Sequence, residues 1–403
     1  MKMAEGFIYL DYAASTPVDP RVFDRMRECS EATCANPSST HAAGRVSKDI
    51  IAGAAAQVAG LLTVDPKTLV WTSGATESDN LAIAGGARYR ASRGKHIITM
   101  KTEHKAVTDV FDKLGKEGFE VTWVDPGSNG LLDPAAFEAV LREDTQFASI
   151  MFVNNETGVI QDIEALGNIC RERGILFHVD AAQAVGKVQI DLSKLPVDLL
   201  SLTGHKFYGP KGIGALYIAD RPGCHVDPIL FGGGQQRRLR PGTLPTELIA
   251  GLGMAAEIAA ESINDDLEHL KALRDVLWGG IKDIEGVMVN GDPGGFPGIL
   301  NVSVDDIEGE SLLLALEPLL VATGSACNSK IQEPSYVLRA LGLNDELAHS
   351  SLRFSFGRFT TEADVDAAVA QLRTAVEKLR ELSPLWDMYK DGVDLDSIEW
   401  AAH

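Results

Sequence analysis

Cysteine is scarce in this sequence, with five residues among 403, at positions 29, 34, 170, 224 and 327. No two of them form a C-x-x-C pair, and a chain of this length does not need disulfides to hold its core, so we expect reduced thiols. Apolar runs approaching the roughly 20 residues of a membrane-spanning helix are also missing. Residues 1–10 carry one lysine and a short apolar patch, which predicts neither a secretory signal nor a transit peptide. The expected location is the cytoplasm, or an organelle matrix if a leader has been removed.

Positive charge is in short supply as well. Lys and Arg number 37 against 57 Asp and Glu, giving a formal net charge of −20. This balance disfavours broad attraction to nucleic acid or anionic lipid, so no direct nucleic-acid or membrane partner is expected. The glycine fingerprints of dinucleotide-binding and P-loop proteins are absent too, which argues against a Rossmann dehydrogenase or a P-loop enzyme.

Short β-rich runs alternate with helix-like runs between residues 68 and 219. This pattern predicts an α/β fold with a mostly parallel, seven-stranded sheet that helices flank on both faces. The seven expected strands are residues 68–72, 96–100, 119–124, 147–153, 175–179, 199–203 and 213–218.

The rest of the chain predicts a second, smaller α+β domain. A helical pattern covers residues 248–277, and a Pro- and Gly-rich loop at 291–297 precedes a strand at 299–304. Further elements are expected as helices at 310–320, 336–341 and 362–382 and a strand at 352–355. We therefore expect a large domain at 16–262, with 1–15 and 263–403 forming the small one.

Polar residues follow the expected parallel strands where each strand ends. They include a helix start at residues 73–77, His104, the segment 154–158, Asp180 and Lys206. Because ligands in such sheets bind beyond the carboxyl ends of the strands, these groups predict one composite active site.

Lys206 and Asp180 suggest the chemistry of that site. A lysine in a partly desolvated turn beside other cations can lose its proton and form a Schiff base, although an exposed turn lysine is the plain alternative. An aspartate ending an apolar strand needs a charge partner, and the protonated ring nitrogen of pyridoxal phosphate would be one; a structural, hydrogen-bonded aspartate is the alternative. Residues 74–76 at a helix start could bind the phosphate, or Ser73 or Thr76 could simply cap the helix.

The sequence resembles the cysteine desulfurases of the housekeeping type that serves iron–sulfur cluster assembly, within the class-V aminotransferase family of fold-type I pyridoxal-phosphate enzymes. The resemblance covers essentially the whole chain. The matching motifs are residues 9–14 (YLDYAA), 72–82 (TSGATESDNLA), 101–107 (KTEHKAV), 153–156 (VNNE), 178–183 (HVDAAQ), 204–214 (GHKFYGPKGIG), 324–327 (GSAC) and 333–356.

This resemblance implies a role for each matching residue. Lys206 would carry the cofactor covalently, Asp180 would pair with the ring nitrogen, and Gln183 would donate to the phenolic oxygen. His104 would stack on the ring as an acid–base group, and Cys327 would take sulfur from L-cysteine as a persulfide, leaving L-alanine. The remaining cofactor-binding residues would be Ala75, Thr76, Asn155, Thr203, His205 and, from a partner subunit, Thr243; the substrate-binding residues would be Asn36, Asn155 and Arg353.

The resemblance also implies partners. It predicts a homodimer, an iron–sulfur scaffold protein docked on the C-terminal tail at residues 384–400, a frataxin-like regulator, a ferredoxin and sulfur-relay proteins, including those of tRNA thiolation. Cys327 could also serve as a shared ligand of a 2Fe-2S cluster on the scaffold. Pro241 departs from the serine usual before Gly242 and Thr243 in the family, which bears on the phosphate contact expected there.

Two rival functions differ from this one in the residues they need. An aminotransferase or a selenocysteine lyase shares the fold, but an aminotransferase has no use for a thiol at Cys327. A scaffold whose main task is to bind partners would have no use for Lys206, His104 and Arg353. The favoured prediction is therefore a cysteine desulfurase, a sulfurtransferase.

Overall fold

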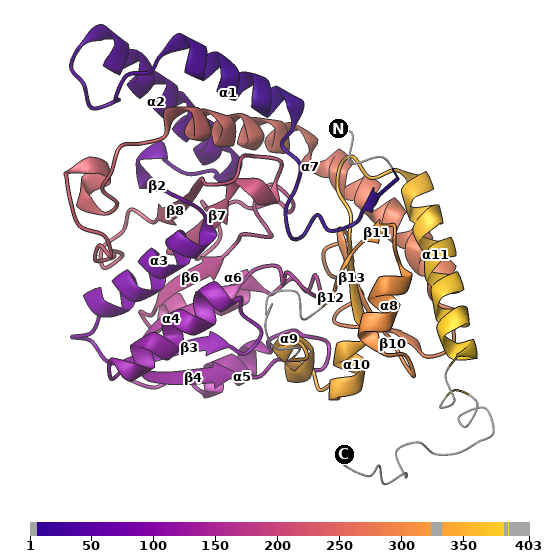
Figure 1. Cartoon of the computed structure of the whole chain (residues 1–403). Coiled ribbons are helices and arrows are strands. Elements are labelled where there is room, and N and C mark those ends of the chain that lie inside the picture. The colour runs from indigo at the N-terminus through magenta and orange to yellow at the C-terminus, as the bar shows by residue number, and fades with distance from the viewer. Residues whose placement is uncertain (1–5, 324–332, 383–385, 387–403) are drawn as a thin grey trace.

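The computed structural model describes residues 6–323, 333–382 and 386. The chain builds a large mixed sheet between helices and a smaller sheet beside it (Figure 1). Cys327 and most of the C-terminal tail at 384–400 lie outside the described residues.

The large sheet has seven strands in the order β2-β8-β7-β6-β5-β3-β4. Strand β8 is antiparallel to both of its neighbours, and all the other strands run in one direction. The prediction of a mostly parallel, seven-stranded sheet is therefore confirmed, with bounds within about two residues of the expected ones. The strands are Leu69–Thr72 (β2), His96–Met100 (β3), Glu120–Val124 (β4), Thr145–Met151 (β5), Leu176–Asp180 (β6), Leu199–Thr203 (β7) and Gly214–Ile218 (β8).

Apolar side chains cover both faces of this sheet, because alternate residues of a strand point to opposite sides. In β7, Leu199 joins one core cluster, while Leu200 and Leu202 join the other. The first cluster lies under Ala75–Tyr89 (α3) and Lys105–Lys116 (α4). The larger cluster includes Pro20–Ala32 (α1), Ala42–Leu62 (α2), Pro134–Ala139 (α5) and Ile163–Glu172 (α6). Short 3-10 turns complete this part of the chain at Pro66–Thr68, Gly204–Lys206 and Gln235–Arg238.

The smaller sheet is antiparallel, with strand order β12-β13-β10-β9. Its central strands, β10 and β13, are buried throughout. Its strands are Val287–Val289 (β9), Ile299–Val304 (β10), Ala322–Thr323 (β12) and Ser351–Ser355 (β13), and the helices nearby are Gly309–Ala315 (α8), Tyr336–Ala340 (α9), Asp345–His349 (α10) and Glu362–Glu381 (α11).

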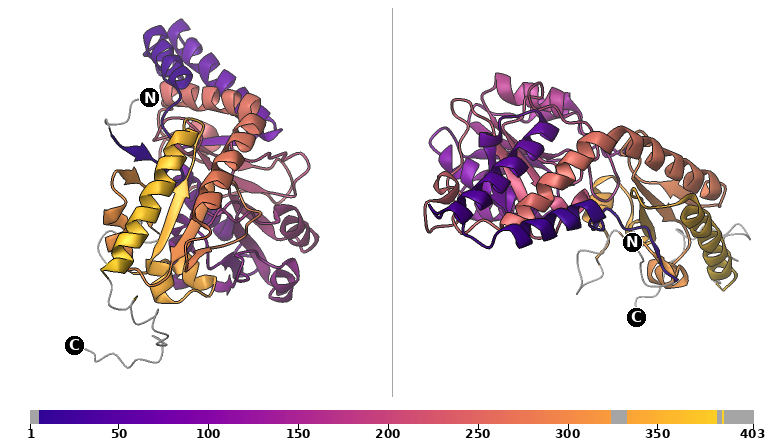
Figure 2. Two further views of the ribbon diagram at one scale, coloured as in Figure 1. Left: turned by 90° about the vertical axis from the view of Figure 1, so that its right-hand side faces the viewer. Right: turned by 90° about the horizontal axis from the view of Figure 1, so that it is seen from above.

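The 36-residue helix Thr246–Ile281 (α7) links the two sheets, as Figure 2 shows. Glycines let it pack closely at both ends. A Cβ at Gly253 would lie 2.7 Å from Ala54 of α2, and one at Gly280 would lie 2.7 Å from Val369 of α11. The predicted domain boundary at residue 262 falls inside this helix, and the division into domains at 16–262 stays a prediction.

One expected helix is wrong over its second half. Residues 310–320 were expected to be helical, but α8 ends at Ala315, and Leu319–Leu320 (β11) instead pair in parallel with Ile8–Tyr9 (β1). Pro318 has no N–H to donate to a helix, and the strand partner comes from the other end of the sequence. Among the described residues, no helix is long and apolar enough to cross a membrane.

Candidate active site

The strands β2, β3, β5, β6 and β7 end at one edge of the large sheet, since they all run in the same direction. The residues that follow them therefore meet there, as predicted. Asp180 ends β6, Lys206 lies in the 3-10 turn that follows β7, and His104 caps α4 just after β3. The charges of His104 and Lys206 both act on the Asp180 carboxyl, so these three groups form one electrostatic cluster.

Lys206 is held by backbone carbonyls. Its Nζ donates to Ala13 O at 2.6 Å and to Ala14 O at 2.9 Å. These carbonyls belong to the N-terminal segment, which is tied to the small sheet because Ala13 N donates to Ser355 Oγ at 2.9 Å. The amine is thereby fixed at the point where the large sheet meets residues from the smaller one.

Asp180 is 3% exposed, and its Oδ1 accepts a hydrogen bond from Ala182 N at 2.9 Å. Burial raises the pKa of its carboxyl, while the charges of His104 and Lys206 lower it. A buried carboxylate at such a position calls for a cationic partner, and a protonated ring nitrogen would supply one. Asp180 is thus buried where such a partner could approach, and its role toward the ring nitrogen stays a prediction.

Two further buried carboxyl groups, which the sequence analysis did not single out, lie close to Asp180. Asp79 of α3 and Glu103 after β3 are both 0% exposed, and His178 Nε2 lies 3.6 Å from Asp79 Oδ1. Burial, reinforced by the charge of Asp180, raises the pKa of each well above its usual value. Burial raises the pKa of all three carboxyl groups, and each negative charge in this group disfavours ionisation of its neighbours.

Histidines at the site are neutral. His104 Nδ1 accepts a hydrogen bond from Ala106 N at 3.1 Å, so the ring proton lies on Nε2. Burial lowers the pKa of His104, and burial together with Lys206, Lys211 and Lys187 lowers that of His205 to about 4. A neutral His205 can still donate a hydrogen bond to a phosphate, and a neutral His104 can lie against an aromatic ring.

The start of α3 has the features of an anion site. Its N-cap is Gly74, and no side chain caps the helix, so capping by Ser73 or Thr76 is not found. Gly74 has φ +153°, and a Cβ there would lie 3.4 Å from Thr203 Oγ1. The backbone N–H groups at Ala75 and Thr76 lie in the first turn of this helix, at its positive end, where an anion is favoured. These features suit the binding of a phosphate group.

Arg353, in the buried strand β13, points toward the same region. Its Nη1 donates to Asn155 O at 2.7 Å, and its Nη2 pairs with Asp11 Oδ1 at 2.6 Å. The Nε atom is buried and has no partner among the described residues. Arg353 thus lies between Asn155 and Asp11, and its role in substrate binding stays a prediction.

Two predicted residues are exposed in the single chain. Asn36 lies in the loop between α1 and α2, where its Oδ1 accepts from Ser38 N at 2.9 Å. Thr243 lies between the 3-10 turn Gln235–Arg238 and α7. That segment is anchored to the start of α3, because Arg240 forms a half-buried ion pair with Glu77 at 2.8 Å. The roles predicted for both residues remain predictions.

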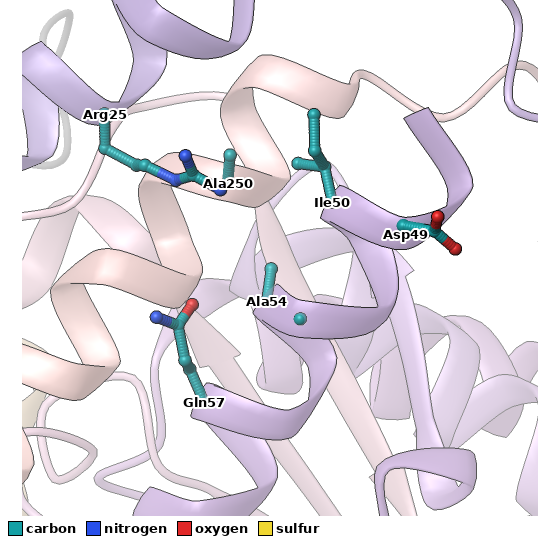
Figure 3. A pocket seen from close by; sticks show the side chains of 7 residues that line it. Arg25, Asp49, Ile50, Ala54, Gln57 and Ala250 are labelled. Atoms are coloured by element: carbon teal, nitrogen blue, oxygen red, sulfur yellow. The ribbon is translucent and has the colours of Figure 1, made fainter. Parts of the chain in front are cut away.

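Two cavities open on the described surface. One, of about 490 Å³, lies between α3 and α4 and reaches Thr76 and His104. The other, of about 150 Å³, lies between α1, α2 and α7 (Figure 3). Its lining residues include Arg25, Asp49 and Gln57, and none of its lining residues is among those predicted for the site. The first cavity is therefore the one adjoining the candidate site.

Glu156, in the segment that follows β5, gives the site a measurable pH dependence. It is 8% exposed and accepts a hydrogen bond from Ser335 Oγ at 2.5 Å. Burial raises its pKa from 4.5 to about 7. The folded state then holds this proton more tightly than the unfolded state. The stability that it adds is full below about pH 4.5 and is lost as pH rises through about 7.

Glu156→Gln should remove this dependence, because glutamine stays neutral and can still accept from Ser335. We expect the variant to match the wild type near about pH 4.5 and to exceed its free energy of unfolding by about 3 kcal/mol near about pH 8. Urea unfolding across this range measures the difference. Glu172→Gln, at an exposed glutamate of α6, is the matched control. Parallel pH profiles for wild type and Glu156→Gln would show that Glu156 ionises normally.

Comparisons with known proteins agree with this geometry. Residues 8–368 match the family described as aminotransferase class-V. The chain is 56% identical over 400 residues to the cysteine desulfurase IscS of Vibrio vulnificus (strain CMCP6), covering 98% of this chain and 99% of that protein. The cysteine desulfurase IscS of Escherichia coli O139:H28 (strain E24377A / ETEC) is equally similar, with 56% identity and the same coverage.

Solved structures give the same result. A NifS-like protein superposes with a TM-score of 0.86 at 35% identity, covering 93% of this chain and 100% of the other. SspA in complex with cysteine superposes with a TM-score of 0.77 at 37% identity, covering 88% and 99%. The chain therefore belongs to the cysteine desulfurases, pyridoxal-phosphate-dependent enzymes of the class-V aminotransferase family.

Proposed function

We propose that this cysteine desulfurase transfers the sulfur of L-cysteine to Cys327, leaving L-alanine and a persulfide on that residue. The observation that supports this assignment best is the position of the two described segments that flank Cys327. On one side, Ala322 of β12 pairs with Arg353 of β13. On the other, Ser335 bonds Glu156, and the Tyr336 hydroxyl donates to Glu103 O at 2.6 Å.

Both flanks thus contact residues of the site. Cys327 follows Thr323, the last residue of β12, by four positions, and four residues span at most about 14 Å of extended chain. This short separation from β12 supports the proposal that Cys327 serves the site at Arg353, the residue proposed to hold the substrate. The other four cysteines carry no such constraint: Cys29 and Cys170 are buried, and Cys34 and Cys224 lie in loops.

When bound, pyridoxal phosphate supplies an electron sink for the amino acid. The protein residues bind the cofactor and the substrate and move the protons. Lys206 would hold the cofactor covalently and would move the Cα proton of the substrate. Asp180 would pair with the ring nitrogen, and Gln183 would donate to the phenolic oxygen. Ala75, Thr76, Thr203 and His205 would hold the phosphate, and Asn155 and His104 would contact the ring.

Sulfur transfer then balances without an outside oxidant. The Cys327 thiolate attacks the sulfur of the substrate, and the carbon–sulfur bond breaks. Its electron pair stays with the carbon, which takes up a proton and becomes the methyl group of alanine. The Cys327 thiol and L-cysteine thus give the Cys327 persulfide and L-alanine. The test is product analysis: L-alanine should form in an amount equal to the sulfur that a reductant releases from the protein.

Arg353 provides a prediction for substrate binding. Arg353→Lys keeps a positive charge for Asp11 but loses the planar fork that binds a carboxylate through two nitrogens. We expect KM for L-cysteine to rise about tenfold to a hundredfold, since a charged hydrogen bond contributes about 1.5–3 kcal/mol, with a smaller change in kcat. Steady-state kinetics measures both constants. Arg171→Lys, at an exposed residue of α6, should change neither, and an unaltered KM in Arg353→Lys would remove Arg353 from the substrate site.

We further propose that the enzyme acts as a cytoplasmic homodimer, with Thr243 completing the phosphate site of the partner subunit. Thr243 is exposed in the single chain, and nearby Phe231 is 86% exposed and Leu230 45% exposed. Large apolar side chains this exposed suit burial against a second subunit. They lie in the segment between β8 and α7, which also carries Thr243, and they support the dimer.

The proposed sulfur acceptors are an iron–sulfur scaffold protein at the C-terminal tail and sulfur-relay proteins, including those of tRNA thiolation, with a frataxin-like regulator and a ferredoxin as further partners. Cys327 would take part in any shared 2Fe-2S cluster on the scaffold. Among the residues that the structure describes, no group of three or more His, Cys, Asp and Glu could hold a metal. Residues 16–262 would form the cofactor-binding domain, and 1–15 with 263–403 the domain bearing Cys327 and the tail.

A further inference from the structure

A second lysine, Lys187, is joined to Lys206 by a chain of hydrogen bonds. Lys187 Nζ donates to Gln183 Oε1 at 2.5 Å, and Gln183 Nε2 donates to Ala13 O at 2.7 Å. The same Ala13 oxygen accepts from Lys206 Nζ at 2.6 Å. Gln183 is 3% exposed, its contact with Ala13 is buried, and its contact with Lys187 is partly buried. Neither the proposed function nor the sequence analysis gives Lys187 a role.

The backbone that follows β6 places Lys187 beside Gln183. Residues 181–188 form successive turns, with Val185 N bonded to Ala181 O at 3.0 Å and Val188 N bonded to Ala184 O at 2.9 Å. Gly186 has φ +73°, and a Cβ there would lie 2.8 Å from Phe207, the neighbour of Lys206. Only glycine suits this backbone at so close an approach. The turns therefore fix Lys187 against both Gln183 and the Lys206 segment.

Lys187 occupies an electrostatically costly position. Burial and the charges of Lys206 and Arg353 lower its pKa well below the usual value. Its Nζ lies 5.8 Å from the centroid of the Phe296 ring. A lysine that served only to fill space could be replaced by an apolar side chain without this cost. Its hydrogen bond to the Gln183 amide suggests that Lys187 orients this amide.

The two contacts of Gln183 define the orientation of its amide. The Ala13 carbonyl only accepts, so it must face the amide nitrogen, and Lys187 Nζ donates to the amide oxygen on the other side. One N–H of Gln183 is used by Ala13, and the other remains to donate. Gln183 can therefore present a donor, and not an acceptor, to an oxygen at the site.

We propose that Lys187 is a positioning residue that holds the Gln183 amide with its nitrogen toward the site, so that Gln183 donates to the phenolic oxygen of the cofactor. This inference rests on the proposed role of Gln183. Without Lys187, the Gln183 oxygen loses its hydrogen-bond donor. The orientation that places the amide nitrogen toward the cofactor is then less stabilised.

The test is a pH titration of the visible absorption of the bound cofactor in Lys187→Met. A donor to the phenolic oxygen and a nearby positive charge both disfavour protonation of the nitrogen that joins Lys206 to the cofactor. Losing either raises the pKa of that nitrogen. We expect this pKa to rise by about one unit in Lys187→Met, since one charged hydrogen bond contributes about 1.5 kcal/mol. Lys116→Met, at an exposed lysine at the end of α4, should leave the titration unchanged.

A double-mutant cycle with Gln183→Ala identifies the route of the effect. If Lys187 acts through Gln183, adding Lys187→Met to Gln183→Ala should change the pKa much less than it does in the wild type. An unshifted titration in Lys187→Met, or a full and additive shift in the double variant, would overturn the inference. Failure of the proposed function would give a different result: the Lys206→Ala variant would then keep the visible absorption of the wild-type enzyme.

Discussion

Replacing Lys206 by alanine is expected to lower alanine formation from L-cysteine by at least about a thousandfold and to abolish the visible absorption of the covalently bound cofactor. The proposed mechanism gives Lys206 two tasks, to carry the cofactor and to move the substrate's Cα proton, and alanine can do neither. Product analysis and absorption spectroscopy on the purified protein with added pyridoxal phosphate measure the two losses separately.

Lys211→Ala is the matched control for this experiment. Lys211 follows in the same glycine-rich segment but is exposed, and Lys206 instead donates to the carbonyls of Ala13 and Ala14. We expect Lys211→Ala to keep the wild-type spectrum and to retain alanine formation. A Lys206→Ala protein with normal absorption and normal turnover would place the cofactor on another residue.

Replacing Cys327 by alanine should have an equally large effect on turnover and none on the cofactor. We expect the variant to keep the visible absorption, because the residues proposed to bind the cofactor lie elsewhere in the chain. Alanine formation should fall by at least about a thousandfold, since no other thiol is proposed to attack the substrate's sulfur. The comparison of spectrum with turnover separates loss of the nucleophile from loss of folding.

Cys34 is the best control thiol among the described cysteines, because it is exposed. Cys34→Ala should turn over L-cysteine at the wild-type rate. If Cys327→Ala produced alanine as fast as the wild type, the sulfur would have to leave by another route, and the proposed role of Cys327 would be wrong.

The large sheet could be predicted from the sequence because each strand is a short apolar run and each run is bounded by polar residues. The same pattern located Asp180 and Lys206, since residues that end buried parallel strands meet at one edge. Strand β11 could not be predicted in this way. Leu319–Leu320 are a strand only because they pair with Ile8–Tyr9, far away in sequence, and local propensity favoured a continued helix.

The contacts around the site were harder to predict than its main residues. Asp79 is one of several polar residues at the start of a helix, and nothing in its neighbours indicates that it is 0% exposed. Lys187 is four residues from Gln183, a spacing consistent with contact. The surroundings that lower the pKa of Lys187, however, are created by the fold and cannot be read from the sequence. The pairing of Arg353 with Asp11 joins residues that are 342 positions apart.

Mass spectrometry of the cysteine-containing peptides, after one turnover with L-cysteine and trapping of thiols, tests the central claim most directly. The account predicts one added sulfur atom on Cys327, in an amount equal to the alanine formed, and none on Cys29, Cys34, Cys170 or Cys224. The Lys206→Ala protein should show no added sulfur. Added sulfur on another cysteine, or free sulfide released together with alanine while Cys327 stays unmodified, would contradict the account.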